Sequence, residues 1–186
     1  MSPRCRRFSK AGHTVADTDI YEHAFDSEFG VIRTAATETA LVLIWLPSGD
    51  EPGFRREVRH RLGRVRLVSG GPINLTAEKQ IREYLRGARK AFDLPLDIRA
   101  TEFHRAVLAE VARIPYGTTR TYARIAEAIG NPGASRAVGT ANARNPLPLV
   151  IPCHRVVAAT GPGNYGGGRA MKVRLLQLEG ALNLLV

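Results

Sequence analysis

"TYARIAEAIGNPGASRAVGTANARNP", residues 121–146, is the stretch that decides the fold of the second half of the chain. Its first segment carries apolar residues on one helical face, and these are Ile125, Ala126 and Ile129. The "GNPG" of residues 130–133 breaks this helix, and Ser135 then offers an N-cap for a second short helix that runs to about Asn142. Two short helices around such a turn predict a helix-turn-helix.

The second helix of this pair has little side-chain bulk around Arg136. Its small residues are Ala137, Gly139, Thr140 and Ala141. A slim helix with one projecting arginine fits a narrow DNA groove, and the arginine can occupy space vacated in the base stack. Tight helix packing also selects alanine and glycine, so a purely structural interpretation stays open.

Upstream of this stretch, the first half of the chain has three short β-type runs separated by turn-like segments. The runs are residues 21–25, 31–36 and 41–46, and they predict an antiparallel meander. Residues 54–62 are expected to form a helix, and "GRVRLVSGG" is expected to add a strand before Pro72. A further helix is expected from Thr76, its N-cap, because apolar residues follow at helical spacing. These residues are Ile81, Tyr84, Leu85, Ala88 and Phe92.

The segment "DLPLDIRA" (93–100) carries a proline and no helical period, so it is expected to connect two halves. Beyond it, Thr101 precedes a helix whose apolar residues repeat every four positions, at Phe103, Val107 and Val111. A last helix around "MKVRLLQLEG" is expected to end at Gly180. The predicted organisation is an α+β chain of two small domains. Its segments are a basic tail (1–20), an N-terminal α/β domain (21–96) and a C-terminal domain (97–186).

The composition indicates an ordered protein outside the membrane. The 186-residue chain is 44% hydrophobic, enough to bury a core, and no apolar run is long enough for a membrane-spanning helix. The opening "MSPRCRRFSKAGH" has basic residues but no apolar segment behind them, so it does not predict a secretory signal; an organelle transit peptide stays open. We expect a cytoplasmic location, associated with the nucleoid if the source is bacterial.

The charge balance is strongly basic, with 27 lysines and arginines against 17 acidic residues and a formal net charge of +10. Arginine dominates, because only four of the basic residues are lysines: Lys10, Lys79, Lys90 and Lys172. The planar fork of arginine suits phosphates and base edges, so the surplus favours a polyanionic partner. A base composition that encodes arginine and alanine cheaply explains the charge equally well.

The chain has two cysteines, Cys5 and Cys153, which can form neither a disulfide framework nor a four-cysteine zinc site. Cys153 lies in "VIPCHRVV" (150–157), directly before His154. A free thiol with a pKa of about 8.5 needs activation, which His154 could give through a water molecule, with Glu179 orienting the imidazole. Each of these residues also has an ordinary structural interpretation.

The segments "RAVGTANAR", "NPLPLVIPCHRVV" and "GNYGGGRAMKVRLLQLEG", taken together, resemble the O6-alkylguanine-DNA alkyltransferases, the methylated-DNA protein-cysteine methyltransferases. The resemblance runs from about Thr101 to Ala181 and includes the "PCHR" core, the upstream "NP" pair and the terminal "LxxEG" in family order. The N-terminal half matches more loosely, through "FDSEFGVIRTAAT", and the first twenty residues lie outside the resemblance.

This resemblance implies a fold and a set of residue roles. The N-terminal domain would be RNase-H-like and the C-terminal domain winged-helix-like. Cys153 would accept the alkyl group, with His154 and Glu179 completing its relay, and Asn145 would hold the turn before it. Arg136 would take the place of the flipped nucleotide. The other implied DNA contacts are Tyr122, Ser135, Ala137, Gly139 and Thr140, and the implied base pocket contains Tyr165, Gly166, Gly167 and Val156.

The implied function is DNA repair by direct transfer of the alkyl group from O6-alkylguanine, and from O4-alkylthymine, to Cys153 in a single turnover. Tyr122 would hydrogen-bond the flipped base and stabilise its departing charge. No cofactor is expected. No metal is expected either, because Cys5, His13 and His23 do not match the zinc ligands of some family members. Gly166 lies where some members carry serine, so one contact to the base is expected to be absent.

Double-stranded DNA that carries O6-alkylguanine is the expected partner, bound by a monomer with cooperativity left open. Three other functions remain as alternatives: a non-catalytic protein that recognises alkylated DNA, a helix-turn-helix regulator and a Cys-His hydrolase. Cys153 argues against the first, because the recognition branch of the family replaces this cysteine. The small side chains of residues 137–142 argue against the second, because they are too short to reach base edges.

Overall fold

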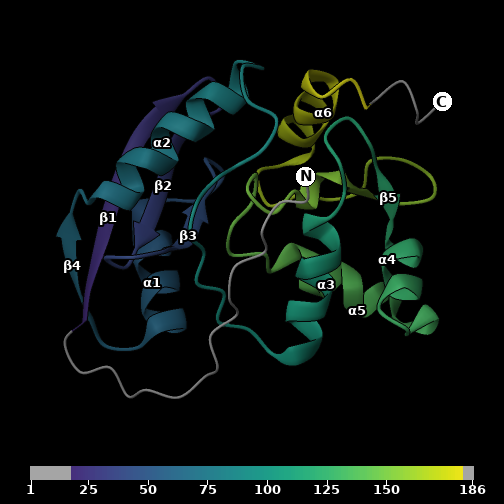
Figure 1. The fold of residues 1–186 in the computed structure, drawn as a ribbon, viewed down its shortest axis with the longest axis horizontal. Helices are drawn as coiled ribbons and strands as arrows, with labels where there is room; N and C mark the ends of the chain where they lie inside the picture. The colour runs from purple at the N-terminus through teal and green to yellow at the C-terminus, as the bar shows by residue number, and fades with distance from the viewer. Residues whose placement is uncertain (1–17, 182–186) are drawn as a thin grey trace.

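A computed structural model describes residues 18–181 and has an α+β fold (Figure 1), as the sequence predicts. The N-terminal half holds a four-stranded sheet in the order β3-β2-β1-β4. Its strands are β1 (Thr18–Ser27), β2 (Gly30–Ala36), β3 (Leu41–Trp45) and β4 (Val65–Ser69). The first three pair antiparallel, which confirms the predicted meander.

The fourth strand pairs parallel with β1, and this requires a crossover connection. Helix α1 (Glu51–Leu62) supplies it, and its N-terminus is capped by Asp50, whose side chain accepts a hydrogen bond from the Gly53 amide. The expected helix and the expected extra strand are therefore both confirmed, although the helix begins three residues earlier than the sequence indicates.

Helix α2 (Pro72–Leu85) follows β4, and here two sequence predictions are wrong. Thr76 is not the N-cap, because Pro72 starts the helix with its fixed φ, and the Thr76 hydroxyl instead donates to the Pro72 carbonyl inside the first turn. The helix also ends at Leu85 rather than at Phe92, since Gly87 turns the chain with a φ of 76°.

The second half is built from helices and one pair of very short strands. Its elements are α3 (Glu102–Ala112), β5 (Arg120–Thr121), α4 (Tyr122–Ala128), η1 (Pro132–Ala134), α5 (Ser135–Ala143), η2 (Cys153–Arg155), β6 (Val156–Val157) and α6 (Arg169–Leu178), where η marks 3₁₀ helices. Strands β5 and β6 pair in parallel, which the sequence did not indicate. The pairing joins the start of α4 to the residues that follow η2.

The helix caps of this half test three predictions. Thr101 caps α3 as expected, because its side chain accepts a hydrogen bond from the His104 amide. Gly180 ends α6 as expected, with a φ of 72° and a hydrogen bond from the Ala181 amide to the Leu176 carbonyl. Ser135 as an N-cap is wrong, because η1 runs directly into α5, so that Ser135 is already its first residue.

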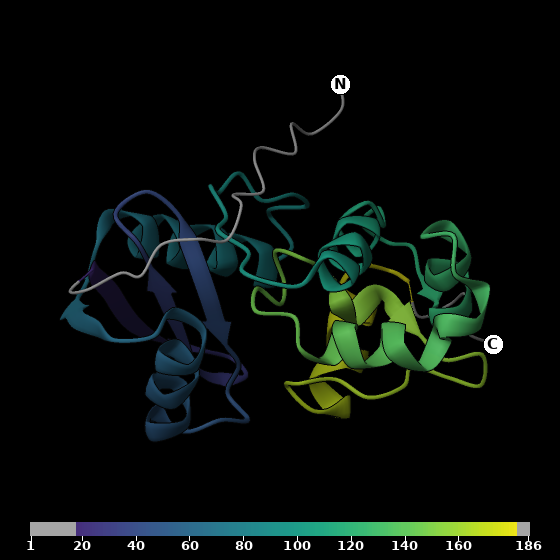
Figure 2. The ribbon, with the colours of Figure 1, turned by 90° about the horizontal axis from the view of Figure 1, so that it is seen from below.

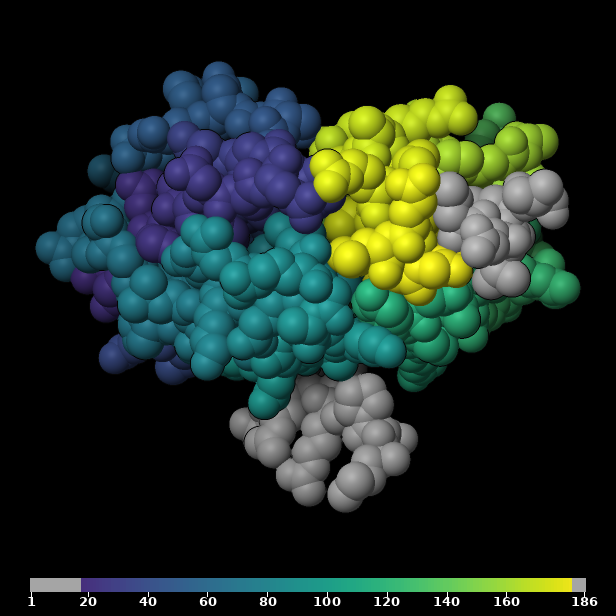
Figure 3. All heavy atoms as spheres, turned by 90° about the horizontal axis from the view of Figure 1, so that it is seen from above, coloured from purple at the N-terminus to yellow at the C-terminus, as the bar shows by residue number. Residues whose placement is uncertain are grey.

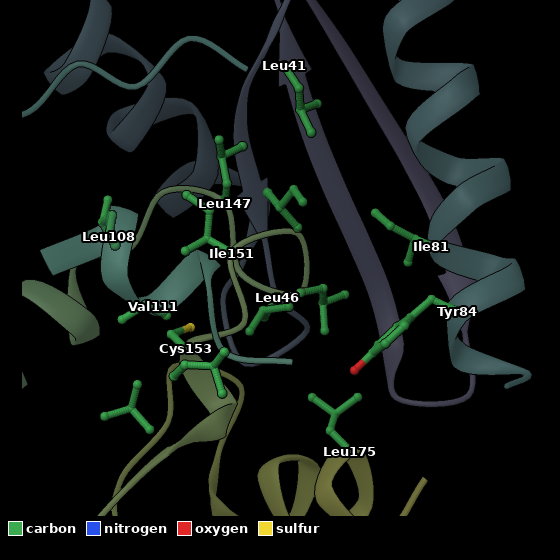
Figure 4. Close-up of a cluster of buried hydrophobic side chains, with 14 of the residues drawn as sticks. Leu41, Leu46, Ile81, Tyr84, Leu108, Val111, Leu147, Ile151, Cys153 and Leu175 are labelled. Carbon is green, nitrogen blue, oxygen red and sulfur yellow. The ribbon is translucent and has the colours of Figure 1, made fainter. Parts of the chain in front are cut away.

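The sheet lies between two helices (Figure 2), with α1 on one face and α2 on the other. A small cluster joins Phe54 and Val58 of α1 to the sheet. The main core continues from the α2 face into the second half of the chain, so the two halves share one core (Figure 4). Some of its members are Leu41, Ile44, Ile81, Tyr84, Val107, Leu147, Ile151, Cys153 and Leu175.

The two halves also meet at the surface. Figure 3 shows α6, in yellow, beside the β1–β2 hairpin in purple and the segment that follows α2 in teal. Across this boundary the Arg174 guanidinium of α6 forms an ion pair with Glu28 at 2.5 Å, and the ring of Phe29 lies under the same guanidinium. Residues 1–17, which include Cys5, His13 and most of the predicted basic tail, lie outside the described residues.

Candidate active site

Cys153 begins the short helix η2, directly after Pro152, and only 5% of it is exposed. Its amide donates to the Ile151 carbonyl at 2.7 Å, and its carbonyl accepts a hydrogen bond from the Asn142 side chain at 3.2 Å. Burial raises the pKa of the Cys153 thiol to about 11. A hydrogen bond from Asn145 and the charge of Lys172 lower this pKa, but by less than burial raises it. The resting thiol is therefore protonated at neutral pH, and its reaction needs a base.

His154 and Glu179 lie side by side, as the sequence predicts, although 25 residues separate them. His154 Nε2 is 3.0 Å from Glu179 Oε1, and both side chains are fully buried. Burial lowers the pKa of His154, so the imidazole is neutral at pH 7. We assign its proton to Nε2 because the carboxylate can only accept. Nδ1 is buried and has no hydrogen-bond partner within residues 18–181, so it is open to take a proton.

The Glu179 carboxylate is the centre of a buried cluster. Arg155 donates to both of its oxygens at 2.8 Å, and the Gly117 amide donates to Oε2 at 3.2 Å. The Tyr84 hydroxyl donates to Oε1 at 2.5 Å. Burial acts to raise the pKa of Glu179, but the bonds from His154, Arg155 and Tyr84 outweigh it and lower this pKa to about 2. The carboxylate thus stays charged and holds the imidazole in place.

Sequence reasoning missed three residues of this region. Arg155 was visible in the "PCHR" core but had no assigned partner, and Tyr84 looked like one more apolar position of a helix. Lys172 is fully buried, donates to the Val156 carbonyl at 2.6 Å and the Asn164 carbonyl at 3.2 Å, and has its pKa lowered by burial to about 8. Its charge near Cys153 favours the thiolate.

Asn145 fastens the loop that leads to Cys153. Its side-chain nitrogen donates to the Ile151 carbonyl at 2.8 Å, and its oxygen accepts from the Leu147 amide at 3.0 Å. The loop contains Leu149 with a φ of 74°, an unusual conformation for a leucine. The two bonds across the loop hold this strained segment and fix where Cys153 lies.

Of the four predicted pocket residues, Tyr165 contacts His154 directly, and Gly167 lies against Tyr165. The ring of Tyr165 meets the ring of His154 edge to face, with centroids 6.2 Å apart. A side chain at Gly167 would overlap Met171 Sδ and come within 3.1 Å of the Tyr165 ring, whereas Gly166 has open space around it. Val156 is buried, and its carbonyl accepts a hydrogen bond from the Lys172 ammonium group.

Tyr122, in the first helix of the helix-turn-helix, lies near Cys153 and near the second helix of the pair. It is the first residue of α4, and burial raises the pKa of its hydroxyl, which stays a neutral donor. A Cβ built on Gly163 would lie 3.3 Å from this hydroxyl, and one built on Gly139 would lie 3.9 Å from the ring. The structure therefore places Tyr122 between the slim helix α5 and the loop that carries Tyr165.

The small residues of α5 lie on its solvent side except Ala141, which packs inward, contrary to the expectation from the sequence. Arg136, Ala137 and Thr140 are exposed, and Ser135 and Gly139 are partly exposed. The residues that pack inward are Val138, Ala141 and Asn142. A Cβ at Gly139 would make only an ordinary contact, so packing inside the protein does not explain the missing bulk on this face. This observation favours the close approach of a partner over the structural interpretation.

Comparison with known proteins places the chain in a family. Residues 102–181 match the family described as 6-O-methylguanine DNA methyltransferase, DNA binding domain. A methylated-DNA–protein-cysteine methyltransferase of Methanosarcina acetivorans is 49% identical over 143 residues, which cover 73% of this chain and 91% of the relative. The constitutive enzyme of Bacillus subtilis is 47% identical over 86% of this chain and 94% of its own length. The chain belongs to the methylated-DNA–protein-cysteine methyltransferase family.

A solved structure of this methyltransferase family has the same fold. The Mycobacterium tuberculosis OGT in complex with DNA superposes with a TM-score of 0.73 and 34% identity, covering 88% of this chain and 93% of the other. The segment matched to the methyltransferase DNA-binding domain contains Cys153, His154, Arg155 and Glu179, but it does not contain Tyr84.

Among residues 18–181, no three histidine, cysteine, aspartate or glutamate side chains come together as metal ligands. His23 bonds instead to Glu78, with Nε2 and Oε2 2.6 Å apart. None of the helices in the part of the chain that the structure describes is long and apolar enough to cross a membrane.

Proposed function

We propose that this chain repairs duplex DNA by moving the alkyl group of O6-alkylguanine, and of O4-alkylthymine, onto Cys153 in a single turnover. The observation that carries the proposal is the buried Cys153 thiol beside a neutral His154 that Glu179 holds through Nε2. The names of the relatives and the likeness to an OGT in complex with DNA support it.

The proposed reaction uses the residues of the site in a fixed order. The Cys153 proton passes through a water molecule to His154 Nδ1, and the sulfur attacks the alkyl carbon as the bond from that carbon to O6 breaks. Glu179 stabilises the imidazolium that forms. Tyr122 donates a hydrogen bond to the departing purine, whose negative charge it stabilises. The thiol sulfur supplies the nucleophile, and the proton that His154 took from it returns through water to the base anion, which ends as the repaired neutral base. No cofactor takes part in this proposal.

The proposed DNA interface is the exposed face of α5. The base must leave the stack to reach Cys153, which costs a few kcal/mol, and Arg136 fills the space that it leaves. Around it, Ser135, Ala137, Gly139 and Thr140 let the helix lie close to the DNA backbone. We assign residues 97–186 to this DNA-binding and acceptor unit and residues 21–96 to the sheet unit that supports it.

The proposal extends to the state and place of the protein. A monomer that binds alkylated duplex DNA in the cytoplasm, on the nucleoid if the source is bacterial, accounts for the basic charge and the exposed α5 face. Tyr165, Gly166, Gly167 and Val156 form the base pocket in this proposal. A Cys-His hydrolase remains the alternative that the same thiol and imidazole favour, and turnover distinguishes the two.

The deciding experiment is intact-protein mass spectrometry after incubation with an O6-methylguanine duplex. We expect a mass increase of one methylene, mapped by peptide analysis to Cys153. Cys153→Ala should show no increase but should still bind the duplex, because binding relies on α5. Methylation of that variant, or no mass change in the natural chain, would overturn the proposal.

A further inference from the structure

Tyr84 joins the His154–Glu179 pair from the other half of the chain. It lies in α2, its side chain is fully buried, and its hydroxyl points away from α2 toward the second half (Figure 4). The hydroxyl oxygen is 2.5 Å from Glu179 Oε1 and 3.1 Å from His154 Nε2. Its contacts therefore reach residues that lie 70 and 95 positions further along the chain.

The proton of this hydroxyl has one possible destination. Glu179 is ionised and can only accept, so the Tyr84 hydroxyl donates to Oε1. A lone pair of the same hydroxyl oxygen then faces the Nε2–H of His154. That N–H accordingly has two acceptors, Glu179 Oε1 at 3.0 Å and Tyr84 Oη at 3.1 Å. Two acceptors at one nitrogen fix the tautomer more firmly than one does.

Packing alone does not require a hydroxyl at this position. The Tyr84 ring packs against Phe92 and Tyr116, with centroids 5.3 and 6.3 Å away, and phenylalanine would fill the same volume. A buried hydroxyl costs free energy unless it is hydrogen-bonded, and the hydrogen bonds of this one go to the His154–Glu179 pair.

We propose that Tyr84 is a positioning residue for alkyl transfer, whose hydroxyl holds His154 in the tautomer that leaves Nδ1 open to the Cys153 proton. The inference rests on the proposed function. It makes the sheet unit part of the reaction, because α2 supplies the second acceptor for the imidazole. The relay thereby extends from Cys153 through His154 and Glu179 to Tyr84.

Several titratable or charged groups surround the His154–Glu179 pair and could make the transfer rate change with pH. They are Cys153, Arg155, Lys172, Tyr116 and Tyr165, besides Tyr84, His154 and Glu179 themselves. Burial raises the pKa of Tyr84, and the Glu179 charge raises it further, so its hydroxyl keeps its proton throughout the working range. Changes of rate with pH therefore report on the Cys153 thiol and the His154 base.

The test compares Tyr84→Phe with the matched control Tyr116→Phe. The Tyr116 ring packs edge to face against the Tyr84 ring, but the Tyr116 hydroxyl donates to the Leu178 carbonyl and not to the His154–Glu179 pair. On an O6-methylguanine duplex at pH 7, we expect Tyr84→Phe to lower the single-turnover transfer rate about tenfold. The loss should shrink as the pH rises, while Tyr116→Phe keeps the natural rate. Equal rates in the two variants would overturn the proposal.

A double-variant cycle separates positioning from stability. In a Glu179→Gln background, Tyr84→Phe should change the transfer rate less than about twofold, because the hydroxyl acts through the same pair. A full additional tenfold loss there would contradict the inference. If Tyr84→Phe does not fold, Tyr84→Met also removes the hydroxyl and adapts its shape to the cavity.

A second readout does not depend on alkyl transfer. Nitrogen-15 NMR of the imidazoles, assigned with His154→Gln, should show Nε2 protonated and Nδ1 bare in the natural chain. Tyr84→Phe should shift His154 toward a mixture of tautomers, and Tyr116→Phe should not. An unchanged His154 spectrum in Tyr84→Phe would overturn the role of the hydroxyl. A natural chain that transfers no alkyl group would instead overturn the proposed function, and the spectrum would still decide on Tyr84.

Discussion

At the scale of single residues, burial shifts the thiol and the imidazole in complementary directions. It raises the pKa of Cys153 to about 11 and lowers the pKa of His154, so both groups are neutral at pH 7. The structure thus keeps a protonated thiol beside an unprotonated base. In the proposed reaction, the thiolate forms at neutral pH when His154 takes the proton, and Glu179 then has a cation to stabilise.

His154→Ala should slow alkyl transfer by about 10² to 10⁴ at neutral pH, the range that general-base catalysis supplies. The rate should then rise with pH toward the Cys153 pKa of about 11, because hydroxide can form the thiolate directly. Single-turnover rates between pH 6 and 9 check this. A defect of the same size at every pH would instead indicate a structural role for His154.

The lowered pKa of Glu179 predicts an acid-sensitive fold. Its pKa is about 2 in the folded chain, below the usual 4.5, so ionised Glu179 stabilises the fold above about pH 4.5. This stability should be lost as the pH falls from about 4.5 to about 2, because protonation ends the ion pair with buried Arg155. Urea midpoints at pH 6, 4 and 3 measure it. Glu179→Gln should be less stable than the natural chain at pH 6, and its stability should depend less on pH in this range.

At the scale of elements, small residues occur in two different surroundings: on the exposed face of α5, and against packed side chains in the loop before α6. On α5 they leave the solvent side flat around the exposed Arg136. In the loop, Gly167 is enclosed by Met171 and Tyr165, while its neighbour Gly166 is open. A side chain at Gly167 would therefore have to displace Met171, whereas one at Gly166 would meet no neighbour among the described residues.

Arg136→Ala should slow repair of O6-methylguanine in duplex DNA much more than reaction with the free modified base. Only the duplex reaction needs the flipped nucleotide to be held out of the stack. Transfer rates on the two substrates measure the difference, with Arg99→Ala as the control because Arg99 lies outside α5 and pairs with Asp97. Equal losses on both substrates would contradict the role of Arg136.

Gly167→Ala should destabilise the fold by about 1 to 3 kcal/mol, the usual cost of forcing an extra methyl group into packed surroundings. Gly166→Ala is its matched control and should change stability little, since no atom of the described residues lies within 4 Å of its Cβ position. Thermal melting of both variants measures this. A Gly167→Ala that melts with the natural chain would show that the loop can move Met171 and Tyr165 aside.

At the scale of the whole molecule, one core runs through both halves, and the acceptor cysteine is part of it. Alkyl transfer converts the thiol into a thioether, which has no negative charge and a strong C–S bond. Cys153 is the free cysteine among the described residues, so this region offers no second thiol beside it. The reaction should therefore end after one event.

With excess O6-methylguanine DNA, the amount repaired should reach a plateau equal to the protein concentration. It should rise in proportion when more protein is added. The alkylated form should melt at a lower temperature than the free form, because extra volume at a site that is 5% exposed costs about 1 to 3 kcal/mol. Steady multiple turnover would favour the hydrolase.

The sequence by itself determined the local structure of this protein and part of its site. Alternating apolar runs gave the meander, the "GNPG" break gave the two helices around a turn, and the order of motifs singled out Cys153, His154 and Glu179. These features depend on residues close together in the chain or on a motif whose members keep their order. The spacing of residues along the chain is therefore enough to predict these strands, helices and motif residues.

The tertiary structure alone decided which side chains complete the cluster around Glu179. Tyr84 and Gly117 reach it from α2 and from the loop after α3, and Arg155 in η2 donates to it through Nε and Nη2. In sequence, Tyr84 is indistinguishable from an apolar position of an amphipathic helix. Only the packing of α2 against the second half brings its hydroxyl to His154, because a hydrogen bond across 70 residues leaves no spacing to detect.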